Sequence, residues 1–387
     1  MVEVALVVMA SVLMWCRPAV IPIWAAPVGG AVLVVVIGSI AVDTAASALG
    51  DVAAPLMFLA LAVPLAVALD DIGVFAALAA AVDGGRHLVA WLWLLAAAVV
   101  ITFNLDAAVV LLTPLYIRIA RRHGLDAEAL AFQPALLACL ASGVLPVSNL
   151  TNLIVAEQFE LGVVDFVTHL ALPSIVATGV GFVAYRRTFH LAPRCDGVDE
   201  PADARALRRG LPIVAFVLVG FTVGDVVGVD AWVVALVALA WATLIVRRVR
   251  WRTVPAEAIA ITAGLVVLVT AAVPHLDLDR WFAGDTALDD VRTVGAAAAL
   301  SNVTNNLPTA LAAAGSIDDP DRAWPILIGT NIGSVFVMTA SLSTLLWRAT
   351  AARSDVVVTP QRWSTVALRV GAPALLLAAV THLLLGR

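Results

Sequence analysis

Long apolar stretches separated by short polar segments fill the chain from one end to the other. A helix needs about 20 apolar residues to cross the roughly 30 Å of a bilayer core. The apolar stretches predict membrane-spanning helices over residues 3–16, 20–42, 52–81, 129–156, 165–185, 210–224, 231–246, 255–273, 325–347 and 363–385. The pattern therefore predicts an all-α membrane protein with about ten transmembrane helices.

Two further apolar stretches, 88–117 and 290–314, are interrupted near their middles. The first contains Asn104 and Asp106, and the second contains the polar run SNVTNNLP at 301–308. Hydrocarbon offers no partner to an opened backbone, so such breaks survive only inside protein or beside a wet cavity. We expect each stretch to be a re-entrant hairpin, because half-helices of about 13 residues reach roughly 20 Å into the bilayer.

The distribution of arginine supports two hairpins, because cytoplasmic loops are enriched in basic residues. Basic loops alternate with acidic ones, such as the outer loop expected at 43–51, only if both interrupted stretches enter and leave on one side. The first hairpin, flanked by Arg86 and Arg118, then opens to the cytoplasm, and the second, flanked by Asp289 and Asp318, opens outward. A plain twelve-span bundle is the alternative.

The two halves of the chain repeat one order of elements: three spans, a hairpin, an interrupted span and a last span. Residues 1–187 form the first half, 188–209 are an Arg-rich cytoplasmic linker, and 210–387 form the second half. An odd number of crossings in each half gives the halves opposite topologies, which is the inverted-repeat plan of secondary transporters. Paired interruptions in such halves indicate the binding site.

Composition agrees with a protein of the bilayer. Of the 387 residues, 62% are hydrophobic and 13% are charged, with a mean hydropathy of +1.01, whereas soluble domains are about 25% charged. Every basic residue is arginine, so a phosphate-binding loop with its lysine is excluded and ATP hydrolysis would need another subunit. We expect a multi-pass protein of the cell membrane, without a metal, a cofactor or a nucleic-acid partner.

Asp106 is the charged residue that the pattern singles out, because its surroundings are apolar. An aspartate at the bilayer centre costs about 2.5–3.5 kcal/mol on insertion scales, so it should face the protein interior. At a hairpin tip it would meet the N-terminus of the returning half-helix, whose free N–H groups favour a carboxylate. We expect a coupling site for a proton or Na⁺; a helix N-cap that never titrates is the alternative.

Amides and hydroxyls gather at the other interruptions, and they suit a neutral or weakly charged polar solute. The second hairpin carries three asparagines within five residues, which is more than helix–helix hydrogen bonding by a single asparagine would need. The interrupted spans share S-x-x-T, at 148–151 and 341–344. The candidate substrate- and ion-binding residues are Asn104, Asp106, Ser148, Asn149, Thr151, Asn152, Ser301, Asn302, Thr304, Asn305, Asn306, Asn331, Ser341 and Thr344.

Two other features are open to two interpretations. Asp70 and Asp71 end the third span, either as a proton relay or as an interfacial helix end. Cys139 lies in the first interrupted span, either as a soft ligand for arsenic or copper or as a small buried side chain. No G-x-S-x-G or H-E-x-x-H motif is present, so we expect no catalytic residue and a transporter instead of an enzyme.

Five stretches resemble the arsenite and antimonite efflux permeases, within the larger ion-transporter superfamily. They are VALDDIGVF at 67–75, DAAVVLLTP at 106–114, LPVSNLTN at 145–152, SNVTNNLPT at 301–309 and SLSTLLW at 341–347. SNVTNNLPT is the most specific of them. The resemblance implies a permease that extrudes arsenite or antimonite in exchange for protons, in some systems together with a separate cytoplasmic ATPase subunit.

One position departs from the pattern of that family. The first tip of the family resembles Asn-Asp together, whereas Leu105 separates Asn104 from Asp106 here. The Ser-Asn-Thr signature of dicarboxylate carriers is not intact in either tip, and no arginine near a tip would neutralise a di-anion. We therefore expect a neutral hydroxylated substrate. A Na⁺/H⁺ antiporter or an organic-anion carrier of the dicarboxylate or citrate type is the alternative.

Overall fold

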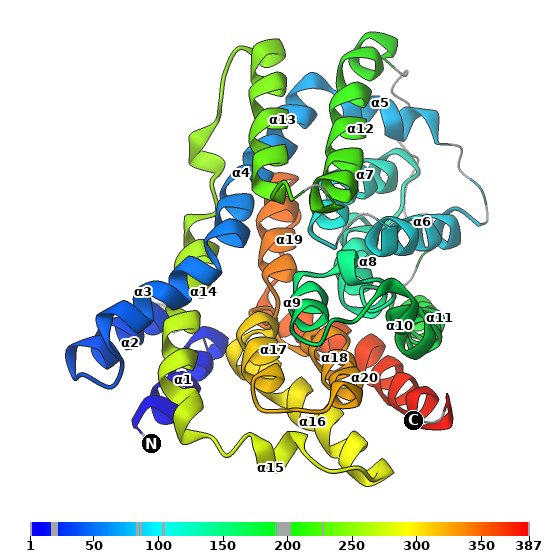
Figure 1. Cartoon of the computed structure of the whole chain (residues 1–387). Coiled ribbons are helices and arrows are strands. Elements are labelled where there is room, and N and C mark those ends of the chain that lie inside the picture. Colours follow the sequence, from blue (N-terminus) through cyan, green and yellow to red (C-terminus); the bar gives the residue numbers. More distant parts are fainter. Residues whose placement is uncertain are drawn as a thin grey trace.

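The computed structural model describes residues 2–16, 22–82, 85, 87–102, 105–189, 191, 203–226 and 228–385. These residues form helices joined by turns, and the described ranges contain no β-strand (Figure 1). Four helices are long and apolar enough to cross a membrane: Ala53–Ile72, Val163–Thr188, Ala256–His275 and Pro360–Leu385. Shorter apolar helices accompany them at Val2–Met14, Ala25–Val36, Leu88–Thr102, Ala127–Leu140 and Ala231–Val246. The chain is therefore an all-helical, multi-pass membrane protein.

Among the residues described, eleven α-helices lie before residue 190 and nine after residue 202. The first half contains α1 (Val2–Cys16), α2 (Ala25–Val36), α3 (Val42–Asp51), α4 (Ala53–Ile72), α5 (Val74–Ala81), α6 (Leu88–Thr102), α7 (Leu105–Arg122), α8 (Ala127–Leu140), α9 (Leu150–Gln158), α10 (Val163–Phe166) and α11 (Leu172–Thr188). The second half contains α12 (Ala204–Val226), α13 (Ala231–Val246), α14 (Ala256–Ala272), α15 (Asp279–Phe282), α16 (Ala287–Thr304), α17 (Asn306–Ala314), α18 (Ala323–Asn331), α19 (Leu342–Arg353) and α20 (Pro360–Leu385).

Both stretches predicted as hairpins are broken near their polar residues. α6 ends at Thr102 and α7 begins at Leu105, and the predicted site residue Asn104, between them, lies outside the described residues. α16 ends at Thr304 because Asn305 has a φ of 91°, a value that L side chains rarely adopt. The two arms of each pair contact the same following helix, α8 or α18. Neither stretch is therefore one straight helix.

The two spans predicted to be interrupted are broken as well. A 3-10 turn at Pro146–Ser148 separates α8 from α9, and a second one at Gly333–Phe336 lies between α18 and α19. Asn149, directly before α9, and Ser341, directly before α19, both have an extended backbone. These two residues therefore hold equivalent places, one position away from the alignment that S-x-x-T suggests.

The most extensive helix contacts of the described chain join α11 with α20, α4 with α13, α7 with α8, α16 with α18 and α2 with α14. One large apolar core contains side chains of α4, α7, α8, α13 and α20. A smaller one lies between α1, α2 and α14. The close contact of α2 and α14 needs Gly264, since a Cβ there would lie 2.6 Å from the carbonyl carbon of Pro27. Across the halves, α7 contacts α19 and α9 contacts α17 (Figure 1).

Two segments differ from the predicted pattern. The third predicted span, 52–81, is divided at Gly73, whose φ of 87° separates α4 from α5. The acidic segment expected as an outer loop, 43–51, is a helix instead. Ala45 and Ala48, three residues apart on that helix, both pack against side chains of α14. Burial of this small apolar face stabilises the helix. The sequence pattern predicted a loop because both ends of the segment are acidic.

Candidate functional site

The two interrupted spans meet at a hydrogen-bond network around Asn331, the last residue of α18. Asn149 Nδ2 donates to Asn331 Oδ1 at 2.7 Å, and Thr151 Oγ1 donates to the same oxygen at 3.0 Å. Asn331 Nδ2 donates to Asn152 Oδ1 at 2.7 Å. All four side chains are buried. One amide of the second half thus joins three predicted site residues of the first half.

Side chains at the first interruption also satisfy its opened backbone. The carbonyl of Ser142 accepts from Ser148 Oγ at 2.6 Å and from Asn152 Nδ2 at 2.7 Å. The carbonyl of Leu145 accepts from the same two side chains, at 2.6 and 3.0 Å. A carbonyl oxygen has two lone pairs, so these two carbonyls hold the break in place and have little capacity left for a cation.

The tip of the second hairpin is attached to the second interruption. Asn302 Nδ2 donates to the Gly333 carbonyl at 2.6 Å, and Asn302 Oδ1 accepts from the Val337 N–H at 2.8 Å. Asn305 Nδ2 donates to the Thr339 carbonyl at 2.9 Å. These amides therefore bind the backbone of the broken span, and they position the tip beside the Asn331 network.

The other predicted residues of the second half differ in how their polar groups are used. Thr304 Oγ1 pairs with a threonine hydroxyl and Ser341 Oγ with a serine hydroxyl, each at 2.7 Å. Thr344 is fully buried in α19. Ser301 Oγ is buried without a hydrogen-bond partner, and the Asn306 side chain makes no hydrogen bond, among the residues described. Ser301 and Asn306 thus have polar groups that a solute could bind.

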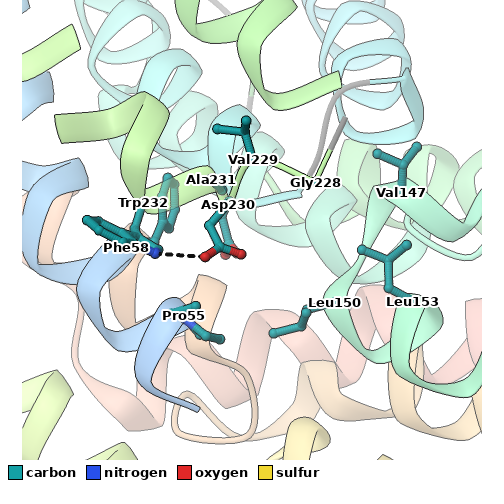
Figure 2. A pocket seen from close by; sticks show the side chains of 12 residues that line it. Pro55, Phe58, Val147, Leu150, Leu153, Gly228, Val229, Asp230, Ala231 and Trp232 are labelled. Atoms are coloured by element: carbon teal, nitrogen blue, oxygen red, sulfur yellow. Dashed lines mark hydrogen bonds between the residues drawn. The ribbon is translucent and has the colours of Figure 1, made fainter. Parts of the chain in front are cut away.

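Asp106 lies in the first turn of α7 and lines a separate cavity of about 220 Å³. The start of α4, the first interruption and the loop 228–232 form the other walls. The described residues around the cavity include two carboxylates, Asp106 and Asp230, but neither arginine nor histidine. Figure 2 shows the hydrogen bond from Trp232 Nε1 to Asp230 Oδ2, 3.0 Å long. The charge around this cavity favours protons, cations or neutral solutes over anions.

The predicted site residues therefore form two neighbouring clusters. Val147 and Leu150 line the Asp106 cavity, while Asn149 and Thr151, beside Leu150 in sequence, bond to Asn331. The first interruption thus has the carboxylate cavity on one side and the amide network on the other. A change at either cluster can reach the other through a few residues of this segment.

Sequence reasoning missed the contribution of Asp230 and Trp232 to this cavity. The charges of the loop between α12 and α13 indicated only on which side of the membrane the loop lies, and no sequence pattern connects this loop with α7. The available sequence signal is an Asp followed two residues later by a Trp at the start of a predicted span. In the structure the Asp230 side chain makes no capping hydrogen bond to α13 and instead accepts from the Trp232 indole. Within the described ranges, no three His, Cys, Asp or Glu side chains converge as a metal site would require.

Asp70 and Asp71, near the C-terminal end of α4, form ion pairs. Arg118 of α7 binds Asp70 through hydrogen bonds of 2.8 and 2.9 Å, and Arg250 binds Asp71 at 2.8 Å. Carboxylates are unfavourable at a helix C-terminus, and the two arginines compensate them. This pairing favours the helix-end interpretation over a proton relay, and it connects α4 with one arm of the first hairpin.

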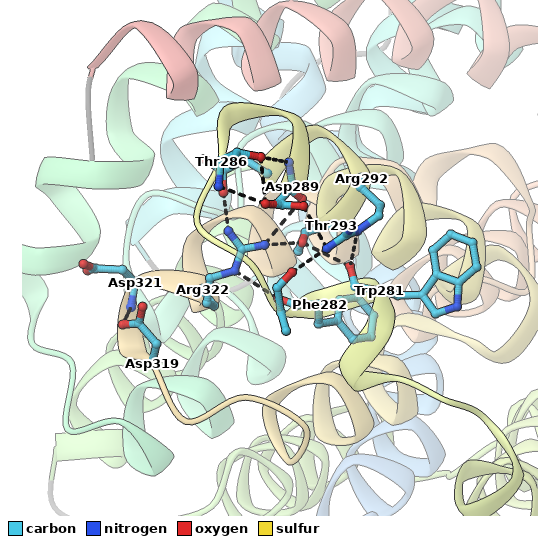
Figure 3. A network of polar contacts seen from close by, with 11 residues as sticks. Trp281, Phe282, Thr286, Asp289, Arg292, Thr293, Asp319, Asp321 and Arg322 are labelled. Atoms are coloured by element: carbon cyan, nitrogen blue, oxygen red, sulfur yellow. Dashed lines mark hydrogen bonds and ion pairs between the residues drawn. The ribbon is translucent and has the colours of Figure 1, made fainter.

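A buried ion pair holds the base of the second hairpin (Figure 3). Arg322, just before α18, pairs with Asp290 in the first turn of α16, and its Nε donates to the Phe282 carbonyl at 2.9 Å. The neighbouring Asp289 accepts from the hydroxyl and the backbone N–H of Thr286, at 2.7 and 2.9 Å. These two bonds lower the pKa of the Asp289 carboxyl. The base of the hairpin is thus fixed to the helix that carries Asn331.

Comparison with known proteins agrees with these features. The family model of citrate transporters (CitMHS) matches residues 5–329 of the chain. The arsenical pump membrane protein of Yersinia enterocolitica is 29% identical over 299 residues, which are 68% of this chain and 69% of the relative. The arsenical pump membrane protein of Escherichia coli (strain K12) is 29% identical over 297 residues, with the same two coverages. The resemblance to arsenical permeases within the ion-transporter superfamily is confirmed.

Proposed function

We propose that this chain, a membrane transporter that belongs to the citrate transporter family, couples the movement of a small solute to an ion gradient. The observation that carries the proposal is Asn331, because its side chain joins the interrupted spans of both halves in one buried network. Buried polar side chains at membrane depth are costly unless they are paired, and they mark solute or ion pathways. The proposed site lies between this network, the second hairpin tip and the Asp106 cavity.

We infer further that residues 1–187 and 210–387 are inverted repeats. The similar order of helices and the reciprocal contacts of α7 with α19 and of α9 with α17 support this arrangement. The pair α6 and α7 then opens to the cytoplasm, and the pair α16 and α17 opens outward. In that orientation the loop 228–232 places the Asp106 cavity toward the outer face.

The proposed substrate is arsenite or antimonite, in its neutral hydroxylated form. Asn306 and Ser301 offer an amide and a hydroxyl to such a solute. A di-anion is disfavoured, because a unit negative charge about 6 Å from a carboxylate is repelled by about 3 kcal/mol at an effective dielectric constant of 20. None of the described residues that line the Asp106 cavity is basic and could offset that repulsion.

Asp106 is the proposed coupling group. A carboxylate that faces a cavity can take up a proton at one side of the membrane and release it at the other when the cavity changes side. Efflux then follows if solute and proton occupy the site in alternation. A separate ATPase subunit is not required by this scheme, since the proton gradient supplies the free energy.

An organic-anion carrier is the second candidate, and one observation favours it: the matching family model describes citrate transporters. A Na⁺/H⁺ antiporter of the same superfamily would use the Asp106 cavity for Na⁺. Both alternatives predict transport in the absence of arsenite, which separates them from the leading proposal.

Expression in an arsenite-sensitive bacterium tests the leading proposal. The chain should raise arsenite resistance, and everted membrane vesicles should take up arsenite only while a proton gradient is present. Asp106→Asn should abolish both effects. Asp43→Asn is the matched control, because Asp43 is an exposed aspartate of α3, and it should leave both effects unchanged.

Three outcomes would contradict the assignment. Unchanged resistance on expression, together with no effect of Asp106→Asn, would remove arsenite as the substrate. Gradient-driven citrate uptake by the same vesicles would establish the organic-anion carrier instead. Sodium-driven pH changes without arsenite would establish the antiporter.

A further inference from the structure

A groove of about 600 Å³ runs between α11 and α20, away from the proposed transport site. Gly179 and Val183 of α11 and Pro373 of α20 contribute to its apolar floor. Arg187 and Arg369 line the same groove, and none of the described residues that line it is acidic. The groove therefore combines an apolar floor with two positive charges at one end.

The surroundings of the groove are suited to lipid. The helices on both sides belong to the long apolar spans, and most of their surface is not covered by protein. Val183 is 49% exposed, Leu368 55% and Leu376 64%. Large apolar side chains exposed along two adjacent spans need acyl chains as neighbours. The groove therefore opens into the bilayer.

The two arginines have no acidic partner in the described part of the chain. Other arginines of this protein do, as the bond of 2.6 Å from Arg362 to Glu128 shows. Arg369 is nine residues after Pro360, the first residue of α20, which places it about 14 Å along the helix axis. An arginine within a membrane-spanning helix needs an anionic partner or a route to the interface. Arg187, in the last turn of α11, lines the groove together with Arg369.

We propose that this groove binds one phospholipid with an anionic headgroup. The guanidinium groups of Arg187 and Arg369 hold the phosphate, for which the planar fork of arginine is well suited, and one acyl chain lies along the floor at Gly179. A Cβ at Gly179 would meet no atom within 4 Å, so this part of the floor is open. Basic pockets between membrane-spanning helices on the cytoplasmic side are typical sites of this kind.

Native mass spectrometry of the full chain tests the proposal directly. The protein is reconstituted in nanodiscs with equal amounts of phosphatidylglycerol and phosphatidylcholine. It is then released from the nanodisc in the mass spectrometer, and the mass of the protein with its retained lipid is measured. The wild type should retain phosphatidylglycerol. Arg187→Gln with Arg369→Gln should weaken that retention about thirtyfold, since each arginine near the headgroups contributes about 1 kcal/mol. Gly179→Leu should weaken it too, because the leucine fills the floor without removing a charge.

Arg186→Gln is the matched control, because Arg186 precedes Arg187, does not line the groove and lies over the Phe182 ring at 6.0 Å. It should retain lipid as the wild type does. Equal retention by the double variant and the wild type, equal retention of the two lipids, or displacement by inorganic phosphate would each overturn the proposal. Asp106→Asn should retain lipid normally, so a failure here and a failure of the transport proposal are distinguishable.

Discussion

Replacing Asn331 by alanine removes all three hydrogen bonds of the network around it. The change leaves Asn149 Nδ2, Thr151 Oγ1 and Asn152 Oδ1 to find other partners. Side-chain hydrogen bonds between membrane helices contribute about 0.6 kcal/mol on average and at most about 1.7 kcal/mol each. Three of them therefore predict a loss of about 2–5 kcal/mol in the free energy of unfolding.

Reversible unfolding of the purified protein in mixed micelles, followed by circular dichroism, measures this loss. Thr330→Ala is the matched control, because Thr330 is equally buried and makes one long bond of 3.4 Å, to a carbonyl of its own helix. It should cost less than about 1 kcal/mol. A loss for Asn331→Ala no larger than that of the control would refute the network as the connection between the halves. A double-mutant cycle that combines Asn331→Ala with Asn152→Ala should show a coupling energy above about 0.5 kcal/mol.

Two further predictions concern the helix contacts around the site. Arg118→Gln should lower the free energy of unfolding by only about 0.5–1 kcal/mol, because the Arg118 and Asp70 side chains are 35% and 36% exposed. The charge-swapped variant, Arg118→Asp with Asp70→Arg, should restore the stability of the wild type. A charge-swapped variant as unstable as Arg118→Gln would contradict the ion pair. Gly264→Ala should cost about 1–3 kcal/mol, since its Cβ would meet the Pro27 backbone at 2.6 Å. Gly295→Ala, where a Cβ meets nothing within 4 Å, should be neutral or stabilising, and thermal unfolding that ranks the two glycines otherwise would contradict the packing.

The interruptions were accessible to sequence reasoning because each requires residues that hydrocarbon would not tolerate in a continuous helix. Asn305 tolerates the positive φ that ends α16, and Pro308 follows in the first turn of α17, where its missing N–H does no harm. Pro146 likewise starts the 3-10 turn of the first interruption. Each helix break is caused by residues at the break itself, so the local sequence pattern was sufficient to predict it.

The remaining features depend on contacts between distant segments, which no local pattern contains. The loop with Asp230 and Trp232 belongs to the second half, yet it covers a cavity of the first half. Gly73 lies within the predicted span 52–81, just after the acidic pair Asp70 and Asp71, and its φ of 87° marks where the helix divides. The equivalence of Asn149 and Ser341 follows from backbone geometry, while the serine–threonine pattern that suggested another alignment does not determine it.

The first half cannot complete its own polar centre during synthesis. The Asn149 side chain bonds to Asn331, which is synthesised 182 residues later, and Gln158 of α9 bonds to the Ala314 carbonyl of α17, which is synthesised 156 residues later. Until the second half is made, these amide groups lack their native partners in the membrane, and water or insertion factors must supply hydrogen bonds to them. A fragment that stops at the linker should therefore be degraded by membrane proteases, whereas the same fragment made together with its missing half should survive.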